Sequence, residues 1–372
     1  MTPITNPLLR ALLYLPARLY ETGVRWRPAL YERGVFATKH LSAPVISVGN
    51  LSVGGTGKTP LTAFITRFLT SAIAQTGGAP DSQVAILSRG YRRQGKGLVE
   101  VSNGRATMAG AARAGDEPWL LAQLCPGARV VVHTDRYTAG RWLEQRAPIY
   151  AFVLDDGFQH LRLARDLNLL LLDGAEPPDQ TALIPWGRLR EPLSAIARAD
   201  AVIITRAHDI DARGPDRAIW RQQLARHTPV ETPVFFAAHH LSGLRRAGTG
   251  AMTNIGALAG RNILAFSGIA RPGRFFADLE RAGMTVAMRR EFRDHHRYTD
   301  TEIAQLLAAA QKAGVTAIVT TEKDMANCSN AITQTMRDHS LPVYAAQLQF
   351  VCEQETELKN LILECMQRKG RR

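Results

Sequence analysis

Residues 45–60 have the sequence VISVGNLSVGGTGKTP, in which an apolar run passes directly into a glycine-rich turn. The run Val45–Val48 predicts a buried strand, and the apolar spacing of Leu61–Leu69 predicts a helix after the turn. A glycine-rich turn between a strand and a helix lets backbone N–H groups wrap around phosphate oxygens. The sequence therefore predicts a phosphate-binding loop inside an α/β fold.

Each part of this loop has an expected role toward a nucleotide. Lys58 would reach the β- and γ-phosphates, and the hydroxyl of Thr59 would ligate Mg²⁺. Ser52 stands where the usual pattern has its first glycine, but the three glycines that follow keep the loop permissive. The predicted nucleotide-binding residues are Ser52, Val53, Gly54, Gly55, Thr56, Gly57, Lys58 and Thr59.

Apolar runs of strand length alternate with helical patterns beyond the loop. Strands are predicted at residues 84–87, 130–132, 150–154, 167–172 and 201–205. This alternation predicts an α/β fold of the P-loop NTPase-like kind, a mostly parallel sheet with helices on both faces. Residues 94–102 carry glycines and an alternating pattern, which predicts a small hairpin inserted in the series.

A second α/β series follows, with strands predicted at residues 263–266, 315–319 and 343–345. Residues 232–260, rich in Gly, Ala and Thr, separate the two series, so we expect the domain junction there. The expected division is an N-terminal helical segment (1–40), a P-loop kinase domain (41–235) and a smaller α/β domain with a C-terminal helix (236–372).

The N-terminal segment has the composition of an amphipathic helix that lies in a membrane interface. Leucines at helical spacing, arginines and aromatic residues make up the pattern: Leu8, Leu12, Leu15, Leu19, Arg10, Arg18, Arg25, Arg27, Tyr14, Tyr20 and Trp26. A helix docked on the protein is the alternative interpretation. Pro16 and Pro28 predict a kink or a helix end at each position. No apolar run reaches the roughly 20 residues that span a bilayer.

Two acidic motifs are candidates for the chemistry of phosphoryl transfer. Asp155 and Asp156 follow an apolar strand, where P-loop proteins hold the carboxylate that supports Mg²⁺. An exposed acidic turn is the alternative. Asp116, in the motif Gly115–Pro118, is either a helix start or the carboxylate that accepts a proton from an alcohol.

Basic and histidine-containing stretches add further candidates. Arginines in the stretches 88–93, 133–136 and 187–192 can bind phosphate as planar forks, or can form solvated surface. The cluster 292–298 contains His295 and His296 side by side, which disfavours a metal site and leaves an acid–base role or a surface loop. Residues 319–324 weakly resemble a guanine-reading pattern.

Composition limits the class of partner. The 46 Lys and Arg residues exceed the 33 Asp and Glu residues, giving a net charge of +13, so an anionic partner is expected. Nucleotide, nucleic acid and an acidic membrane surface all satisfy this condition. Four scattered cysteines without a C-x-x-C pair argue against disulfides and zinc, and indicate a reducing cytosol: Cys125, Cys328, Cys352 and Cys365.

Taken together, the motifs resemble the tetraacyldisaccharide 4′-kinase family of lipid A biosynthesis. The resemblance covers nearly the whole chain in one order and is far more specific than a P-loop alone. The matching pieces are G-N-x-x-x-G-G-T-G-K-T-P (49–60), S-R-G-Y (88–91), G-D-E-P (115–118), H-x-D-R (133–136), D-D-G-F-Q-H (155–160), L-R-E-P (189–192), D-H-H-x-Y (294–298) and T-E-K-D (321–324).

The resemblance implies ATP and Mg²⁺ as cofactors and phosphorylation of the 4′-hydroxyl of tetraacyl diglucosamine 1-phosphate, a membrane lipid. It implies work at the cytoplasmic face of the bacterial inner membrane. We expect no nucleic-acid partner, and no obligate protein partner is evident. Asp116 would be the base, paired with His295, although the adjacent His296 leaves the register open. The remaining implied roles are Mg²⁺ support by Asp155 and Asp156, and a substrate site lined by Tyr91, Arg136 and Arg190.

Two other classes of protein would explain part of the pattern. A P-loop GTPase or partner-activated ATPase accounts for the loop and for Asp155, but has no use for Asp116 or an interfacial helix. A nucleic-acid-binding ATPase is motivated by the net charge alone, because the chain contains no helicase-like series of motifs.

Overall fold

The computed structural model describes residues 7–76, 83–176, 182–208, 210, 217–229 and 231–370. The side chains of residues 7–11 and 330 also lie outside the description, and with them the expected roles of Leu8 and Arg10. Within this part of the chain, no helix is long and apolar enough to cross a membrane.

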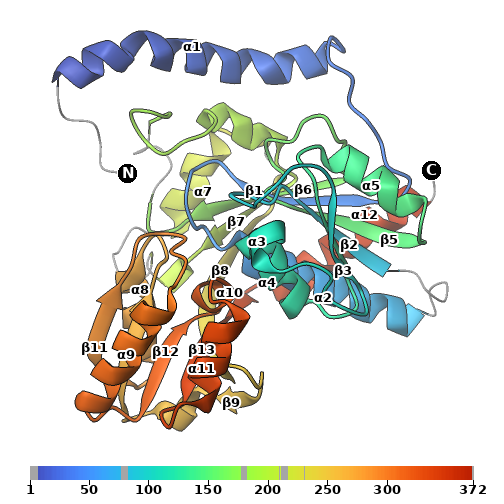
Figure 1. Ribbon diagram of the computed structural model, residues 1–372. Coiled ribbons are helices and arrows are strands. Elements are labelled where there is room, and N and C mark those ends of the chain that lie inside the picture. The colour runs from blue at the N-terminus through green and yellow to red at the C-terminus, as the bar shows by residue number, and fades with distance from the viewer. Residues whose placement is uncertain are drawn as a thin grey trace.

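A single sheet of 13 strands runs through the molecule (Figure 1). Its first half has the order β7-β6-β1-β5-β2-β4-β3, and every neighbouring pair except β3–β4 is parallel. These strands are β1 (Val45–Asn50), β2 (Gln83–Ser88), β3 (Val99–Asn103), β4 (Arg129–Val132), β5 (Ile149–Asp155), β6 (Leu167–Asp173) and β7 (Ala201–Thr205). The predicted α/β class and mostly parallel sheet are confirmed.

Helices cover both faces of this half of the sheet. Its strands are apolar at nearly every position, as is typical of strands that are buried on both faces. Leu61 of α2 and Ile362 of α12 pack on one face. Leu143 of α5 and Trp220 of α7 pack on the other. The helices of this half are α2 (Lys58–Thr76), α3 (Ala111–Ala114), α4 (Asp116–Leu124), α5 (Arg136–Glu144), the 3-10 helix η2 (Leu193–Arg198), α7 (Arg217–Ala225) and α12 (Glu355–Gly370).

The second half continues the sheet in the order β11-β10-β12-β13-β8. Phe276 of α8 packs on one face of its strands, and Leu306 of α9 packs on the other. The elements are β8 (Val234–Arg246), β9 (Met252–Asn254), η3 (Ile255–Leu258), β10 (Asn262–Ser267), α8 (Pro272–Arg281), β11 (Thr285–Glu291), α9 (Asp300–Lys312), β12 (Ala317–Thr321), α10 (Glu322–Ala326), α11 (Asn330–Asp338) and β13 (Val343–Cys352).

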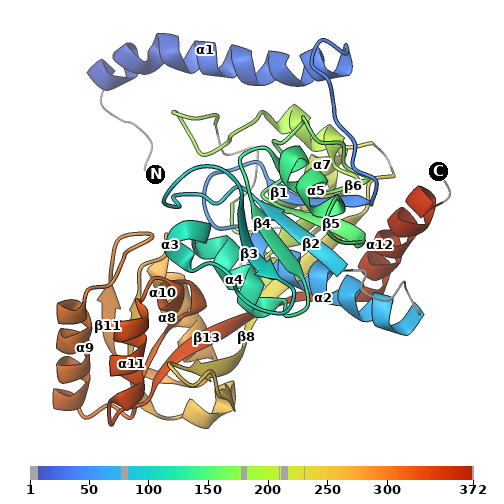
Figure 2. The ribbon, with the colours of Figure 1, turned by 45° about the vertical axis from the view of Figure 1, so that its right-hand side comes forward.

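Two long strands connect the halves. The start of β8 pairs with β7 in parallel, and the rest of β8 pairs with β13 in antiparallel orientation. The expected domain boundary, between residues 235 and 236, therefore falls inside β8. Figure 2 shows β13 crossing back toward the first half, where α12 follows it. Leu358 and Ile362 of α12 lie in the core of the first half, so this helix packs away from the second series to which the sequence pattern assigns it.

The hairpin predicted at residues 94–102 is wrong. Gly95 and Gly97 take positive φ angles, so the first half of this segment forms turns and only β3 follows as a strand. Because β3 pairs with β4, it extends the edge of the main sheet in antiparallel orientation.

The helix does not end at Pro16 or Pro28, because α1 (Pro7–Glu32) contains both prolines, so of the two predicted outcomes the helix end is wrong. Each proline removes one hydrogen bond to the carbonyl four residues earlier. On a helix as exposed as α1, water can take the place of the missing N–H at that carbonyl. In Figures 1 and 2, α1 lies as a long helix beside the body of the molecule, to which residues 33–44 connect it.

Candidate active site

The glycine-rich loop lies between the end of β1 and the start of α2, as the sequence predicts. Gly54 and Gly57 have positive φ angles of 109° and 86°, a conformation that favours glycine. A Cβ atom at Gly57 would overlap the imidazole of His239, and one at Gly54 would overlap the guanidinium of Arg188. The loop is therefore built for close backbone approach and is packed against the Arg188 guanidinium and the His239 imidazole, whose pKa burial lowers to about 4.

Lys58 begins α2 and reaches back across the loop. Its ammonium donates a hydrogen bond to Oδ1 of Asn50 at 3.2 Å and lies 3.5 Å from Oδ1 of Asp156. Arg190 contacts the same two residues, since its guanidinium forms two 2.9 Å hydrogen bonds with the Asp156 carboxylate and also donates to Asn50. Lys58 and Arg190 thus share one acidic partner beside the phosphate-binding loop.

The adjacent carboxylates Asp155 and Asp156 have opposite electrostatic environments. Burial, together with the neighbouring charge of Asp156, raises the pKa of Asp155 to about 6. Burial would also raise the pKa of Asp156, but Lys58, Arg190 and Arg136 outweigh it and hold that pKa well below its ordinary value. Asp155 is therefore short of positive partners, whereas Asp156 already has several.

The different environments of Asp155 and Asp156 bear on whether the site residues could hold Mg²⁺. The described residues contain no cluster of three His, Cys, Asp or Glu side chains that could hold a metal alone. A P-loop site does not need one, because Mg²⁺ there takes most of its ligands from phosphate and water. Asp155 is buried at the end of β5, adjacent to β1, and its carboxylate accepts a hydrogen bond from Ser88 at 3.0 Å. A divalent cation would stabilise this carboxylate, so the site fits the ion.

The structure brings Asp116 and His295 together from opposite halves of the chain. Nδ1 of His295 lies 2.8 Å from Oδ2 of Asp116, which is the first residue of α4. Asn327 donates to the same carboxylate oxygen at 3.2 Å. Burial would raise the pKa of Asp116, but the hydrogen bonds from His295 and Asn327, with the charge of Lys323, hold it below its ordinary value.

These contacts distinguish the two adjacent histidines between which the sequence leaves the choice open. His295 is the histidine that faces Asp116, with a left-handed backbone φ of 61°. His296 points elsewhere, since its Nε2 lies 3.0 Å from Glu302 and its ring stacks on Phe292. Of the two histidines, His295 is the candidate for the active site.

A buried carboxylate, Asp324, supports the loop that carries His295. Its oxygens accept hydrogen bonds from the hydroxyls of Ser267 and Tyr298 at 2.9 and 2.8 Å, and from the backbone N–H of Gly268 at 2.8 Å. The backbone N–H of His295 in turn donates to the carbonyl of Gly268. The T-E-K-D motif, whose function the sequence leaves open, thus anchors the loop of the D-H-H-x-Y motif.

The three expected substrate residues differ in exposure. Tyr91 is 58% exposed, and its ring centroid lies 5.9 Å from that of His295. Arg190 is held by Asp156, as described above. Arg136 is only 5% exposed and donates to the carbonyls of Thr134 and Asp156. Tyr91 and Arg190 therefore line the site more directly than Arg136 does.

Helix α1 contacts the body of the protein next to this site. The hydroxyl of Tyr20 donates to the carbonyl of Arg190 at 2.8 Å, and Arg27 donates to the carbonyl of Gln159 at 3.0 Å. Leu12, Leu15 and Leu19 of the same helix are between 66% and 74% exposed. Helix α1 thus makes polar contacts next to the site, and these three leucines face solvent.

Sequence reasoning missed several residues that position these groups. Asn50 accepts hydrogen bonds from Lys58 and Arg190. It belongs to the G-N motif, so the sequence contained a pattern from which its role could have been predicted. Asn327 follows the T-E-K-D motif without any pattern of its own. Its contact with Asp116 spans 211 positions, so only the fold could reveal it.

Fold and site together define a P-loop phosphotransferase of the α/β class. The chain matches the profile of a family described as LpxK, tetraacyldisaccharide-1-P 4′-kinase, over residues 9–367. It therefore belongs to the tetraacyldisaccharide 4′-kinase family and is an ATP-dependent kinase of lipid A biosynthesis.

Individual relatives agree with the family match. A tetraacyldisaccharide 4′-kinase of Geobacter metallireducens is 42% identical over 85% of this chain and 88% of its own length. The enzyme of Geobacter sulfurreducens is 41% identical over 92% of this chain and 89% of its own length. Among solved structures, LpxK from Aquifex aeolicus in complex with ATP has a TM-score of 0.75 and 32% identity, covering 96% of this chain and 99% of that one.

Proposed function

We propose that this kinase transfers the γ-phosphoryl group of ATP to the 4′-hydroxyl of tetraacyldisaccharide 1-phosphate, with Asp116 as the base. The observation that carries the proposal is the 2.8 Å contact between Asp116 and His295, which joins the P-loop half to the second half. Phosphoryl transfer to an alcohol needs a carboxylate of this kind, placed by a rigid partner near the acceptor oxygen.

Asp116 has the properties that this role requires. Its lowered pKa keeps it ionised at neutral pH, so it can accept the 4′-hydroxyl proton as that oxygen attacks the γ-phosphorus. The bond from the γ-phosphorus to the bridging oxygen then breaks, and ADP leaves. His295 and Asn327 orient the carboxylate, and His295 shares the transferred proton through the existing hydrogen bond.

The phosphate side of the reaction relies on the P-loop. Ser52 and residues 54–57 would supply backbone N–H groups, and Lys58 would supply a charge for the oxygens between the β- and γ-phosphates. Asn50 and Asp156 hold Lys58 in the structure, so nucleotide binding would exchange these partners for phosphate oxygens. Because Asp156 keeps Arg190 as a partner, this exchange does not leave a buried charge alone.

Thr59, Asp155 and Asp156 are the residues that would hold Mg²⁺. The ion would neutralise charge on the phosphate chain during transfer. Asp155 is the stronger of the two carboxylate candidates, since its raised pKa reflects a shortage of positive partners. Asp156 contributes mainly by keeping Lys58 and Arg190 in place beside the loop.

The lipid head group would bind on the side of the site that faces α1. We assign Tyr91 and Arg190 to the sugar and phosphate groups of the substrate, because both are accessible beside Asp116 and Asp156. Arg136 contributes positive charge from its buried position and holds the backbone carbonyl of Asp156. These arginines complement a substrate that carries a 1-phosphate.

We further propose that α1 binds peripherally to the cytoplasmic face of the bacterial inner membrane. Its exposed leucines and Trp26 would enter the lipid interface, and its arginines would meet anionic head groups. The contact between Tyr20 and Arg190 would keep the membrane-facing helix next to the acceptor site. The acyl chains of the substrate could then remain in the bilayer during the reaction.

The direct test is to incubate the purified protein with γ-labelled ATP, Mg²⁺ and tetraacyldisaccharide 1-phosphate in detergent, beside Asp116→Ala. Label on the lipid, with a loss of about 10³-fold or more in the variant, is the expected result. Label released only as inorganic phosphate, with GTP used in preference to ATP, would instead favour a P-loop GTPase or partner-activated ATPase.

A further inference from the structure

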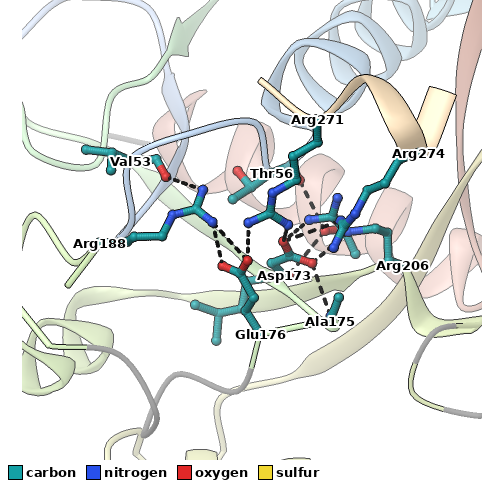
Figure 3. Close-up of polar contacts among 11 residues, drawn as sticks. Val53, Thr56, Asp173, Ala175, Glu176, Arg188, Arg206, Arg271 and Arg274 are labelled. Carbon is teal, nitrogen blue, oxygen red and sulfur yellow. Dashed lines mark hydrogen bonds and ion pairs between the residues drawn. The ribbon is translucent and has the colours of Figure 1, made fainter. Parts of the chain in front are cut away.

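An arginine cluster lies below the P-loop, where the second half of the molecule meets the first (Figure 3). Among the described residues, four guanidinium groups surround two carboxylates there: Arg188, Arg206, Arg271 and Arg274 around Asp173 and Glu176. Asp173 ends β6, the strand next to β1, and is only 7% exposed. None of these residues has a role in the proposed phosphoryl transfer.

Glu176 connects the second half of the molecule to the P-loop. Arg271, which precedes α8, forms an ion pair with Glu176 and lies 3.3 Å from Asp173. Arg188 donates to both oxygens of Glu176, at 2.8 and 3.0 Å. The same guanidinium donates to the carbonyl of Val53 in the P-loop at 2.8 Å.

The path from α8 to the P-loop is thus continuous. The Val53 backbone N–H also donates to the carbonyl of Arg188, at 2.8 Å, so the two residues are joined in both directions. Gly54 has no room for a Cβ atom beside the Arg188 guanidinium. The position of Arg188 therefore determines the backbone path of Val53 and Gly54, at the point where the glycine-rich turn of the P-loop begins.

We propose that Arg271 is a positioning residue for nucleotide binding, which orders the P-loop from the second half of the molecule through Glu176 and Arg188. Arg271 holds Glu176, Glu176 holds Arg188, and Arg188 holds Val53. Asp173 fixes the other side of Arg271, and Arg206 donates to Asp173 at 2.6 Å from the end of β7. The inference rests on nucleotide binding by the P-loop and is independent of the acceptor.

The arginine cluster is balanced by more than two carboxylates. Burial lowers the pKa of Arg274, which lies 3.8 Å from Asp173, and the charges of Glu176 and Asp278 oppose this effect. The link between the cluster and nucleotide binding is therefore the contact of Arg188 with Val53. Because the same P-loop backbone would be ordered by the cluster and by a bound nucleotide, the two should favour each other.

The test measures ATP binding and P-loop order without any lipid. We expect Arg271→Gln to weaken MgATP binding about 10-fold by calorimetry and to speed hydrogen exchange at residues 51–57 in the ligand-free protein. Arg271→Lys keeps the charge but cannot donate to both carboxylates as a fork, and should weaken binding about 3-fold. Arg289→Gln, an exposed position on β11 that pairs with Glu280, is the matched control and should change neither measurement.

A double variant separates positioning from a merely structural role. Because Arg188 and Arg271 act through the same carboxylate, Arg188→Gln combined with Arg271→Gln should weaken ATP binding no more than the stronger single change. If the losses multiply, or if folded Arg271→Gln and Arg271→Lys proteins bind ATP normally with unchanged exchange in the P-loop, the proposal is overturned. A wild-type protein that shows this coupling but labels no lipid would contradict the proposed acceptor and leave the inference standing.

Discussion

The nucleotide side of the site is centred on one short run of chain, whereas the acceptor side joins residues 179 positions apart. Lys58 and its partner Asn50 are eight positions apart, so local sequence specifies the loop itself, and only the supporting contacts of Asp156 and Arg190 come from later in the chain. In the acceptor half, Asp116, His295 and Asn327 meet only because β8 and β13 bring the second half of the sheet over α4. The two halves should therefore respond differently to substitution, with the P-loop controlling ATP binding and the acceptor half controlling transfer alone.

The largest effect that tests this difference is expected at the P-loop. Lys58→Met removes the charge that faces the β- and γ-phosphates, so both ATP affinity and kcat should fall, with kcat lower by about 10³-fold. Lys312→Met, at the exposed end of α9, is the control. Steady-state kinetics with ATP and lipid varied separately would measure both quantities. Loss of kcat with normal ATP affinity would break the contrast between the two halves.

The two adjacent carboxylates predict stability changes of opposite sign. Asp155 has its pKa raised to about 6 from an ordinary 3.8, so its ionised form destabilises the folded protein above pH 6. Asp155→Asn should therefore increase the free energy of unfolding by about 2–3 kcal/mol at pH 8 in the absence of Mg²⁺. The gain should shrink as the pH falls from 6 toward 4, because the folded wild-type protein then keeps the Asp155 carboxyl protonated while the unfolded chain is still partly ionised.

Asp156→Asn should do the reverse, because the low pKa of Asp156 means that its charge stabilises the folded protein above its ordinary pKa. Urea unfolding of both variants from pH 8 to pH 4.5 measures the two signs. A loss of stability in Asp155→Asn at pH 8 would show that the carboxylate has a positive partner already, and would remove the argument for a cation there.

A smaller effect is expected at the membrane-facing side. Changing Leu12, Leu15 and Leu19 to serine removes exposed apolar surface, which should weaken binding to anionic liposomes by about 10-fold. Ile219→Ser with Met252→Ser removes exposed apolar side chains elsewhere and serves as the control. Equal liposome sedimentation of wild type and the leucine variant would contradict the membrane role of α1.

The smallest effect is expected at Asn327. Its alanine variant loses one hydrogen bond to Asp116, worth about 1 kcal/mol, so kcat should fall about 5-fold while ATP affinity stays unchanged. The pKa of Asp116 should rise, which would move the acidic limb of the kcat profile to higher pH. A normal profile in Asn327→Ala would remove this residue from the acceptor half.

The sequence allowed the fold class, the P-loop and the parallel strands to be predicted, because buried strands and the glycine turn leave local patterns. It did not predict β8 or β11, where half-exposed strands mix charged and apolar residues. Nor did it predict the return of α12 to the first core, because no local pattern encodes which core an amphipathic helix covers. Asp116 and His295 could be proposed from motifs, but Asn327 and the arginine cluster arise from tertiary contacts alone.

The measurement that tests the central claim most directly is a double-mutant cycle on Asp116 and His295, read by single-turnover transfer of label from ATP to lipid. If the two residues act as one unit, Asp116→Asn and His295→Asn should each lower the rate by about 10²-fold or more. The double variant should then transfer label at nearly the same rate as the slower of the two single variants. Rate losses that multiply, or wild-type transfer by Asp116→Asn, would contradict a base assembled across the two halves of the molecule.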